Sequence, residues 1–204
     1  MSKSPIGIGL LGMGVVGGGV ASALDQKRAQ LTALIGCPID LKGVLVRDAA
    51  KPRTQKLPPG ILTTNATDIF NNPEIDIVVE LMGGQDPAFD YIRKSIDQGM
   101  HVVTANKEVM ARHGPDILTL ARKKGVQVLF EASVAGGTPI IGPLLRDLAA
   151  NEVISIHAII NGTTNYILTK MATEGMELEV ALREAQNLGY AEADPTNDVE
   201  GIDA

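Results

Sequence analysis

The sequence is poor in aromatic residues and in positive charge. Of its 204 residues none is tryptophan, three are tyrosine and three are phenylalanine. That is too few for the stacking platforms of single-strand nucleic-acid binders or for an aromatic-rich β-sandwich. Lysine and arginine number 18 against 24 acidic residues, and the net charge of −6 gives no general attraction to nucleic acids or anionic membranes. We therefore expect a small-molecule partner, no nucleic acid and no membrane.

Cysteine and long apolar runs are also scarce. The single cysteine, Cys37, excludes an internal disulfide framework and is typical of a reducing cytoplasm. No segment reaches the roughly 20 uninterrupted apolar residues of a membrane span. The first 24 residues imitate a secretory signal, but seven glycines break their apolar run. We expect a cytoplasmic protein.

What the sequence does contain is a regular alternation of strand-like apolar runs and helical patterns, which is typical of βαβ units around a parallel sheet. The expected strands are Ile6–Leu11, Leu41–Val46, Ile75–Glu80, His101–Thr104 and Gln127–Glu131. After a glycine pair at 136–137 the pattern changes. A helical stretch (140–149) leads to an apolar strand (153–160) and two more helical stretches. We predict an α/β fold with one domain over residues 1–135 and a second over 136–204.

The first motif, GLLGMGVVGGGVASAL, directly follows a predicted strand and opens a helix. Gly12 permits a tight turn, Gly14 lets the backbone approach a pyrophosphate, and Gly17 lets helix and strand pack closely. The helix N-terminus then offers N–H groups and a positive dipole to phosphates. In this context the pattern predicts dinucleotide binding in a Rossmann-type doubly wound parallel sheet, although a merely glycine-rich turn is the alternative.

The stretch VLVRDAAKPR decides which dinucleotide is expected. NAD-binding proteins usually carry an acid at the end of the second strand, whereas Arg47 stands there, followed by Lys51 and Arg53. A basic residue favours the 2′-phosphate, so we expect NADP(H) to be preferred and NAD(H) to be possible. A solvated loop, with Asp48 serving the ribose hydroxyl, is the other interpretation.

Four further polar motifs follow strands or helices. Lys107, in HVVTANKEVMARHG, is placed to polarise a carbonyl or relay a proton, or else it points to solvent. Glu131, in FEASVAGGTPIIGPL, offers oxygens to a cation or marks a hinge. One of the threonines in IINGTTNYILTKM is a natural helix N-cap. The acids in LGYAEADPTNDVEGIDA either hold a substrate ammonium group or form a solvated loop.

Taken together, these motifs and their order resemble the homoserine dehydrogenase family. The resemblance covers essentially the whole chain, and FEASVAGGTPI, NGTTNYIL and LGYAEADPTNDVEGIDA are far more specific than a Rossmann fingerprint. It implies an oxidoreductase that interconverts L-aspartate 4-semialdehyde and L-homoserine with NAD(P)H, in the branch that leads to threonine, methionine and isoleucine. It also implies that residues 136–204 begin an α+β substrate and dimerisation domain, and that the full-length protein is a homodimer or higher homo-oligomer.

The resemblance also implies roles residue by residue. Lys107 is implied to be catalytic beside the nicotinamide, Glu192 to bind the substrate amino group, and Asp203 to be a catalytic and substrate-binding acid. The expected cofactor contacts are Gly12, Gly14, Val15, Val16, Gly17, Arg47, Thr104, Lys107 and Gly189. A monovalent cation such as Na+ is implied at Glu131, Val134, Gly136 and Thr138, mostly through backbone oxygens.

The chain departs from the family pattern at its end. The family carries a second lysine four residues after the aspartate of GIDA, usually assigned as the proton donor, whereas this sequence ends at Ala204. We therefore expect the 204-residue chain to be an N-terminal part of an enzyme and impaired by itself.

Two other functions fit parts of the sequence. An aspartate-semialdehyde dehydrogenase has a similar build but needs a cysteine nucleophile, and Cys37 lies far in sequence from the substrate motifs. A non-enzymatic module that senses a redox cofactor would bind the nucleotide but no substrate.

Overall fold

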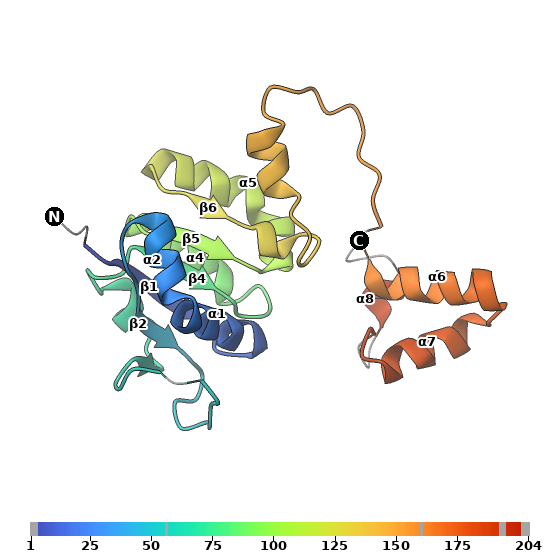
Figure 1. Ribbon diagram of the computed structural model, residues 1–204, viewed down its shortest axis with the longest axis horizontal. Helices are drawn as coiled ribbons and strands as arrows, with labels where there is room; N and C mark the ends of the chain where they lie inside the picture. The colour runs from blue at the N-terminus through green and yellow to red at the C-terminus, as the bar shows by residue number, and fades with distance from the viewer. Residues whose placement is uncertain (1–3, 56, 160, 192–194, 201–204) are drawn as a thin grey trace. The chain divides into compact units, whose positions relative to one another are not determined.

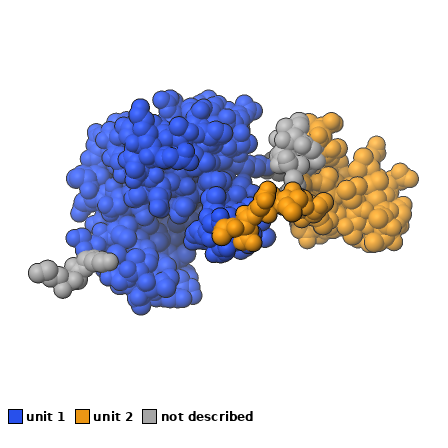
Figure 2. All heavy atoms as spheres, turned by 90° about the horizontal axis from the view of Figure 1, so that it is seen from above, with its two compact units in different colours: residues 1–149 blue, residues 150–204 orange. Residues whose placement is uncertain are grey.

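The computed structural model describes residues 4–55, 57–159, 161–191 and 195–200. The chain divides into two compact units, residues 1–149 and 150–204 (Figure 2). The predicted functional boundary between residues 135 and 136 lies inside the first unit and stays a prediction, because a compact unit and a functional domain need not end at the same residue.

The first unit is built on one sheet of six parallel strands in the order β3-β2-β1-β4-β5-β6 (Figure 1). The strands are β1 (Ile6–Leu11), β2 (Ile39–Leu45), β3 (Leu62–Thr63), β4 (Ile77–Glu80), β5 (His101–Thr104) and β6 (Val128–Leu129). The chain runs outward from β1 through β2 to β3 and then returns to the other side of β1 with β4. This is the predicted Rossmann-type doubly wound sheet. The sequence did not reveal β3, because two residues between turns show no alternation.

Helices cover both faces of the sheet, as alternating strands and helices require. They are α1 (Val15–Gln26), α2 (Arg28–Ile35), α3 (Thr67–Phe70), α4 (Ala88–Asp97) and α5 (Lys107–Lys124). On one face the buried Leu10 packs with Val20 of α1. On the other face Leu11 and Val78 pack with Phe70 of α3. Successive residues of β1 therefore serve opposite cores, which is why this strand is apolar throughout.

The parallel register brings the carboxyl ends of four strands to one edge. Leu11 pairs with Leu45 in β2 and with Glu80 in β4, and Glu80 pairs with Thr104 in β5. The alignment continues one residue further, where the Leu81 N–H donates to Leu11 O at 2.8 Å. The loops that follow these strands share the edge at which open α/β sheets bind ligands.

The second unit contains the helices α6 (Gly162–Glu174), α7 (Leu178–Asn187) and α8 (Thr196–Val199). Ile167 of α6 is buried against Ala181 and Ala185 of α7, and small residues there let the two helices approach closely. The cap of α6 is Asn161, whose side chain accepts from Thr164 N at 2.8 Å. The prediction of a threonine cap was therefore wrong. The side-chain oxygen of Asn161, one residue before the helix, already accepts a hydrogen bond from a backbone N–H of the first turn.

Charged and phenolic groups join the outer sides of α6 and α7. Tyr166 Oη donates to Glu184 Oε1 at 2.6 Å, and Lys170 Nζ lies 2.8 Å from Glu174 and 3.4 Å from Glu184. The hydrogen bond with Glu174 is the main reason that the pKa of Lys170 is raised to about 12. The network orients the two helices and, because it is solvent-accessible, contributes little to stability.

No strand forms in residues 153–159, the described part of the stretch expected to be a strand over 153–160. These residues make no strand hydrogen bonds. Their apolar side chains Ile154, Ile156 and Ile159 are exposed. A strand needs a partner with which to exchange backbone hydrogen bonds, and no described residue pairs with this stretch. None of the helices in the described ranges combines the length and apolar character needed to cross a membrane.

Two glycines of α1 should respond in opposite ways to alanine. In Gly17→Ala the new methyl group would overlap the carbonyl oxygen of Gly12, whereas at Gly19 it would meet nothing within 4 Å. We expect Gly17→Ala to lower the free energy of unfolding by about 1–3 kcal/mol or more. Gly19→Ala should raise it by about 0.4–1 kcal/mol, since alanine restricts the unfolded chain. Urea titrations of the two variants and the parent measure this, and equal effects would contradict the proposed packing.

Candidate functional site at the carboxyl edge of the sheet

The glycine-rich turn brings the start of α1 against the end of β1. Gly12 has a φ of +99°, and a side chain there would meet the carbonyl oxygen of Leu81 at 2.8 Å. Gly17 packs directly on the backbone of Gly12. Gly14 is the N-cap of α1, makes no side-chain cap, and has nothing within 4 Å of where a Cβ would stand. The N-terminus of α1 therefore borders open space at Gly14, as a phosphate-binding turn requires.

A cavity of about 530 Å³ opens beside this turn. Its size is that of an ordinary small-molecule site. Four loops line it, which follow β1, β2, β3 and β4 respectively. The lining residues include Gly12, Met13, Gly14, Arg47, Asp48, Lys51, Arg53, Leu81, Met82 and Gly83. Val15 and Val16, the other two residues expected to contact cofactor in this turn, are exposed on the first turn of α1.

A hollow of similar size, about 520 Å³, lies at the opposite edge of the sheet, near Asn72, Asp76 and His101. None of the described residues that line it is lysine or arginine, and none belongs to the glycine-rich turn. The cavity beside Gly12 is therefore the better candidate for an anionic cofactor.

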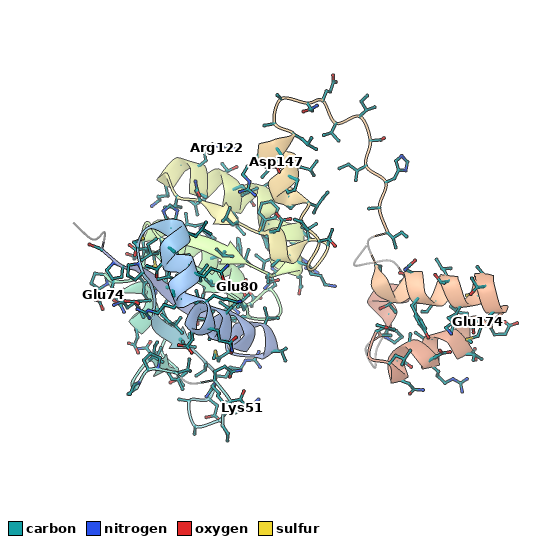
Figure 3. All side chains as sticks on the ribbon, in the orientation of Figure 1. Lys51, Glu74, Glu80, Arg122, Asp147 and Glu174 are labelled. Atoms are coloured by element: carbon teal, nitrogen blue, oxygen red, sulfur yellow. The ribbon has the colours of Figure 1, made fainter. Side chains whose placement is uncertain are left out.

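The basic loop after β2 is folded by one of its own arginines. The Arg53 guanidinium donates to the carbonyl oxygens of Asp48 and Lys51, both at 2.7 Å. The Asp48 carboxylate accepts from Ala50 N at 2.8 Å, which closes a local turn. Arg53 thus shapes the loop, while Arg47 and Lys51 bring positive charge to the cavity. Figure 3 shows Lys51 on this loop.

The ends of β4 and β5 carry a buried polar cluster, and of its two main members the sequence motifs indicated only Thr104. Glu80 and Thr104 are fully buried, and Thr104 Oγ1 donates to Glu80 Oε2 at 2.5 Å. Met82 N donates to Glu80 Oε1 at 2.7 Å. Burial raises the pKa of Glu80 even though these hydrogen bonds oppose the shift. The available signal was a glutamate that ends the otherwise apolar run of β4.

Lys107 begins α5 directly after this cluster, at the same edge. Its neighbour Asn106 is the N-cap, and the side-chain oxygen accepts from Val109 N at 3.1 Å. The Asn106 amide group also donates to Gly84 O at 2.7 Å. The structure therefore brings Thr104 and Lys107 to the carboxyl edge where Gly12 also lies.

Glu131 binds backbone amides with its side chain. Oε1 accepts from the amides of Ile140 and Ile141 at 2.6 and 2.8 Å, and Oε2 accepts from Gly142 at 2.6 Å. These bonds, led by that from Ile140, lower the pKa of Glu131. The carboxylate therefore closes the loop that carries the expected cation ligands Val134, Gly136 and Thr138.

Any cation in this loop would depend on backbone oxygens. Within the described ranges no cluster of three or more histidine, cysteine, aspartate or glutamate residues could hold a metal ion. Ala135 and Gly136 both have left-handed φ angles, 54° and 58°, so the chain bends sharply between the ends that Glu131 ties together.

The remaining expected site residues belong to the second part of the chain, and the single cysteine lies away from the cavity. Gly189 has a φ of +77° and lies just after the C-cap Leu188 of α7, a conformation typical of a glycine that ends a helix. Glu192 and Asp203 lie outside the described residues. Cys37 is buried just before β2 begins. It therefore lies at the amino edge, roughly 20 Å of strand away from the cavity.

We expect Glu131→Ala to expose the amides of Ile140, Ile141 and Gly142 to hydrogen exchange, because the variant removes their acceptor. In the parent their protection should persist at neutral pH. It should be lost as the pH falls through the depressed pKa of Glu131, below its ordinary value of 4.5. Exchange rates corrected for intrinsic pH dependence measure this, with Glu152→Ala as the control. Unchanged protection in Glu131→Ala would contradict the assignment.

Comparison with known proteins matches the chain to two models of one protein family. The family model described as "Homoserine dehydrogenase, NAD binding domain" matches residues 12–131, and the model described as "Homoserine dehydrogenase" matches residues 139–204. The homoserine dehydrogenase of Synechocystis sp. is 50% identical over 197 residues, which are 97% of this chain and 45% of that protein. The chain thus spans about half the length of the curated relatives that it matches.

Solved structures agree with these matches. A homoserine dehydrogenase from Thiobacillus denitrificans superposes with a TM-score of 0.91 at 47% identity, over all of this chain and 47% of that one. A hyperthermophilic archaeal homoserine dehydrogenase in complex with NADPH superposes with a TM-score of 0.82 at 26% identity, over 98% of this chain and 66% of that one. The chain belongs to the homoserine dehydrogenase family.

Proposed function

We propose that the protein containing this chain interconverts L-aspartate 4-semialdehyde and L-homoserine by hydride transfer with NADP(H). The observation that carries the proposal is the meeting of three features at one sheet edge: the open glycine turn, the basic loop, and the start of α5 with Lys107. The family membership supports the substrate assignment, and with it a place in threonine, methionine and isoleucine synthesis in the cytoplasm.

The residues around the cavity fit a phosphorylated dinucleotide. Gly12, Gly14 and Gly17 leave the amides at the start of α1 open to a pyrophosphate, with Val15 and Val16 beside it. Arg47 and Lys51 supply positive charge for a 2′-phosphate, while Asp48 is occupied by its own turn. The structure of the archaeal relative is a complex with NADPH, which is consistent with this preference. NAD(H) remains possible as a weaker ligand. When bound, the nicotinamide supplies or accepts the hydride.

Lys107 is the proposed catalytic group of this unit. Its ammonium group would stabilise the oxyanion that develops on the aldehyde oxygen and deliver a proton to it. Glu192 and Asp203 are proposed to hold the substrate by its amino and hydroxyl groups, with Gly189 beside cofactor and substrate. A substrate fixed in this way presents its carbonyl carbon in a reactive orientation.

We further propose that Glu131, Val134, Gly136 and Thr138 hold a monovalent cation such as Na+ through backbone oxygens. The loop closure by the Glu131 side chain supports this, since it orders the carbonyls between residues 131 and 140. A homodimer or higher homo-oligomer is the proposed assembly of the full-length protein. The position of Cys37 at the amino edge gives no support to a thioester-forming dehydrogenase.

Arg47→Ala should weaken NADPH binding roughly 10- to 100-fold, because hydrogen bonds to a charged phosphate contribute about 1.5–3 kcal/mol. NADH binding should stay unchanged, since NADH lacks the 2′-phosphate. Fluorescence titration with both cofactors measures this. Arg122→Ala, at the far end of α5 (Figure 3), is the matched control. Equal losses for the two cofactors, or none, would refute the phosphate contact.

Lys107→Ala should lower kcat about 10²- to 10⁴-fold, the range for a group that acts on the proton or oxyanion. The assay is NADPH oxidation with aspartate semialdehyde, and NADP+ reduction with homoserine, in the full-length protein. Lys123→Ala on the exposed end of the same helix is the control. A change confined to KM would rule out the catalytic role, and a parent protein inactive in both directions would rule out the function.

A further inference from the structure

A buried carboxylate at the end of β4 needs an explanation beyond packing. Glu80 has no exposed surface, and its neighbours in the strand are the apolar Val78 and Val79. Burying a carboxylate is costly unless hydrogen bonds compensate, and the raised pKa of Glu80 reflects that cost. The other large side chains that are fully buried, such as Leu11 and Val78, are hydrophobic. A carboxylate among them points to a task at the sheet edge.

The carboxylate belongs to a ring of hydrogen bonds that crosses two strands. Its Oε1 accepts from Met82 N at 2.7 Å, and its Oε2 accepts from Thr104 Oγ1 at 2.5 Å. Thr104 Oγ1 in turn accepts from Asn106 N at 3.0 Å. The Asn106 side chain closes the ring by donating to Gly84 O at 2.7 Å. The loop after β4 is thus tied at two points to the residues that start α5.

The ring connects a wall of the cavity to the proposed catalytic lysine. Met82 and Gly83 line the cavity, and Asn106 is the cap of the helix that begins at Lys107. The adjoining carbonyl of Leu81 lies against Gly12, where there is no room for a side chain. Small displacements of the loop would therefore shift both the cavity wall and its contact with the glycine turn.

We propose that Glu80 is a positioning residue, which holds the cavity wall at Met82–Gly84 in register with Lys107. The proposal rests on the proposed function, because it concerns the same site. Glu80 acts through Thr104 and Asn106 and is not itself a catalytic residue. Its carboxylate fixes the direction of two donors at once, the Met82 N–H and the Thr104 hydroxyl.

An amide cannot replace the carboxylate in this ring. In one orientation of a glutamine side chain its NH2 group faces the Met82 N–H, so two donors oppose each other. In the other orientation the NH2 group faces Thr104 Oγ1, whose own proton then has no acceptor in the ring. Glu80→Gln keeps the size of the side chain and breaks the ring, which makes it the test variant.

The experiment measures kcat per cofactor-binding site in the full-length protein. Sites are counted by NADPH fluorescence titration, and turnover is measured with homoserine and with aspartate semialdehyde. Glu80→Gln should bind NADPH at nearly the parent number of sites but lose roughly 10- to 100-fold in kcat per site, as expected for a misplacement of about 1 Å. Glu74→Gln, an exposed residue paired with Lys42, is the matched control and should behave as the parent.

The outcomes of this experiment are distinguishable. If Glu80→Gln has fewer NADPH-binding sites but an unchanged kcat per site, the role of Glu80 is only structural and the proposal is overturned. A Glu80→Gln protein with the same number of sites and the same kcat per site as the parent would overturn it too. If Glu80→Gln does not fold, Thr104→Val and Thr104→Ser provide the test. A loss of kcat per site in Thr104→Val that is absent in Thr104→Ser supports the ring. Equal kcat values per site in the two variants overturn it. A parent without either activity refutes the proposed function and not the ring.

Discussion

The structure of the first unit depends on the direct contact of backbone with backbone at Gly12, Gly17 and Leu81. At this point the end of β1, the first turn of α1 and the loop after β4 meet with no side chain between them. A Cβ at Gly17 would push the helix from the end of β1, and a Cβ at Gly12 would push against the loop after β4. The contact therefore fixes where α1 begins, and hence where its open amides lie beside the cavity.

Two glutamates hold the backbone of the same unit in opposite electrostatic settings. Glu80 accepts two hydrogen bonds, but burial dominates and its pKa is raised. Glu131 accepts three backbone N–H groups in a more accessible loop, where the hydrogen bonds dominate and its pKa is lowered. The same side chain can thus order a buried ring or an outer loop, and the balance of desolvation and donors decides its charge.

The loop after β2 shows why a count of basic residues is a poor measure of a phosphate site. Arg53 is engaged with carbonyl oxygens of its own loop, and the Gln55 side chain fills the space left by Gly18 of α1. The loop is therefore packed against α1, the helix whose N-cap is Gly14. Arg47 and Lys51, which line the cavity, are then the residues that we propose for phosphate recognition.

The sequence by itself determined the fold class, the glycine turn and the edge at which Arg47, Thr104 and Lys107 gather, because apolar periodicity and glycine spacing are local patterns that survive in any parallel α/β sheet. It predicted a strand over 153–160 that has no partner among the described residues, since local pattern does not supply a partner. Only the tertiary structure decided three other features. Arg53 binds carbonyl oxygens of its own loop, Glu131 accepts hydrogen bonds from three backbone amides, and Glu80 belongs to a ring of hydrogen bonds. Glu80 and Thr104 are 24 residues apart, and their hydrogen bond exists because strand register places the ends of β4 and β5 side by side.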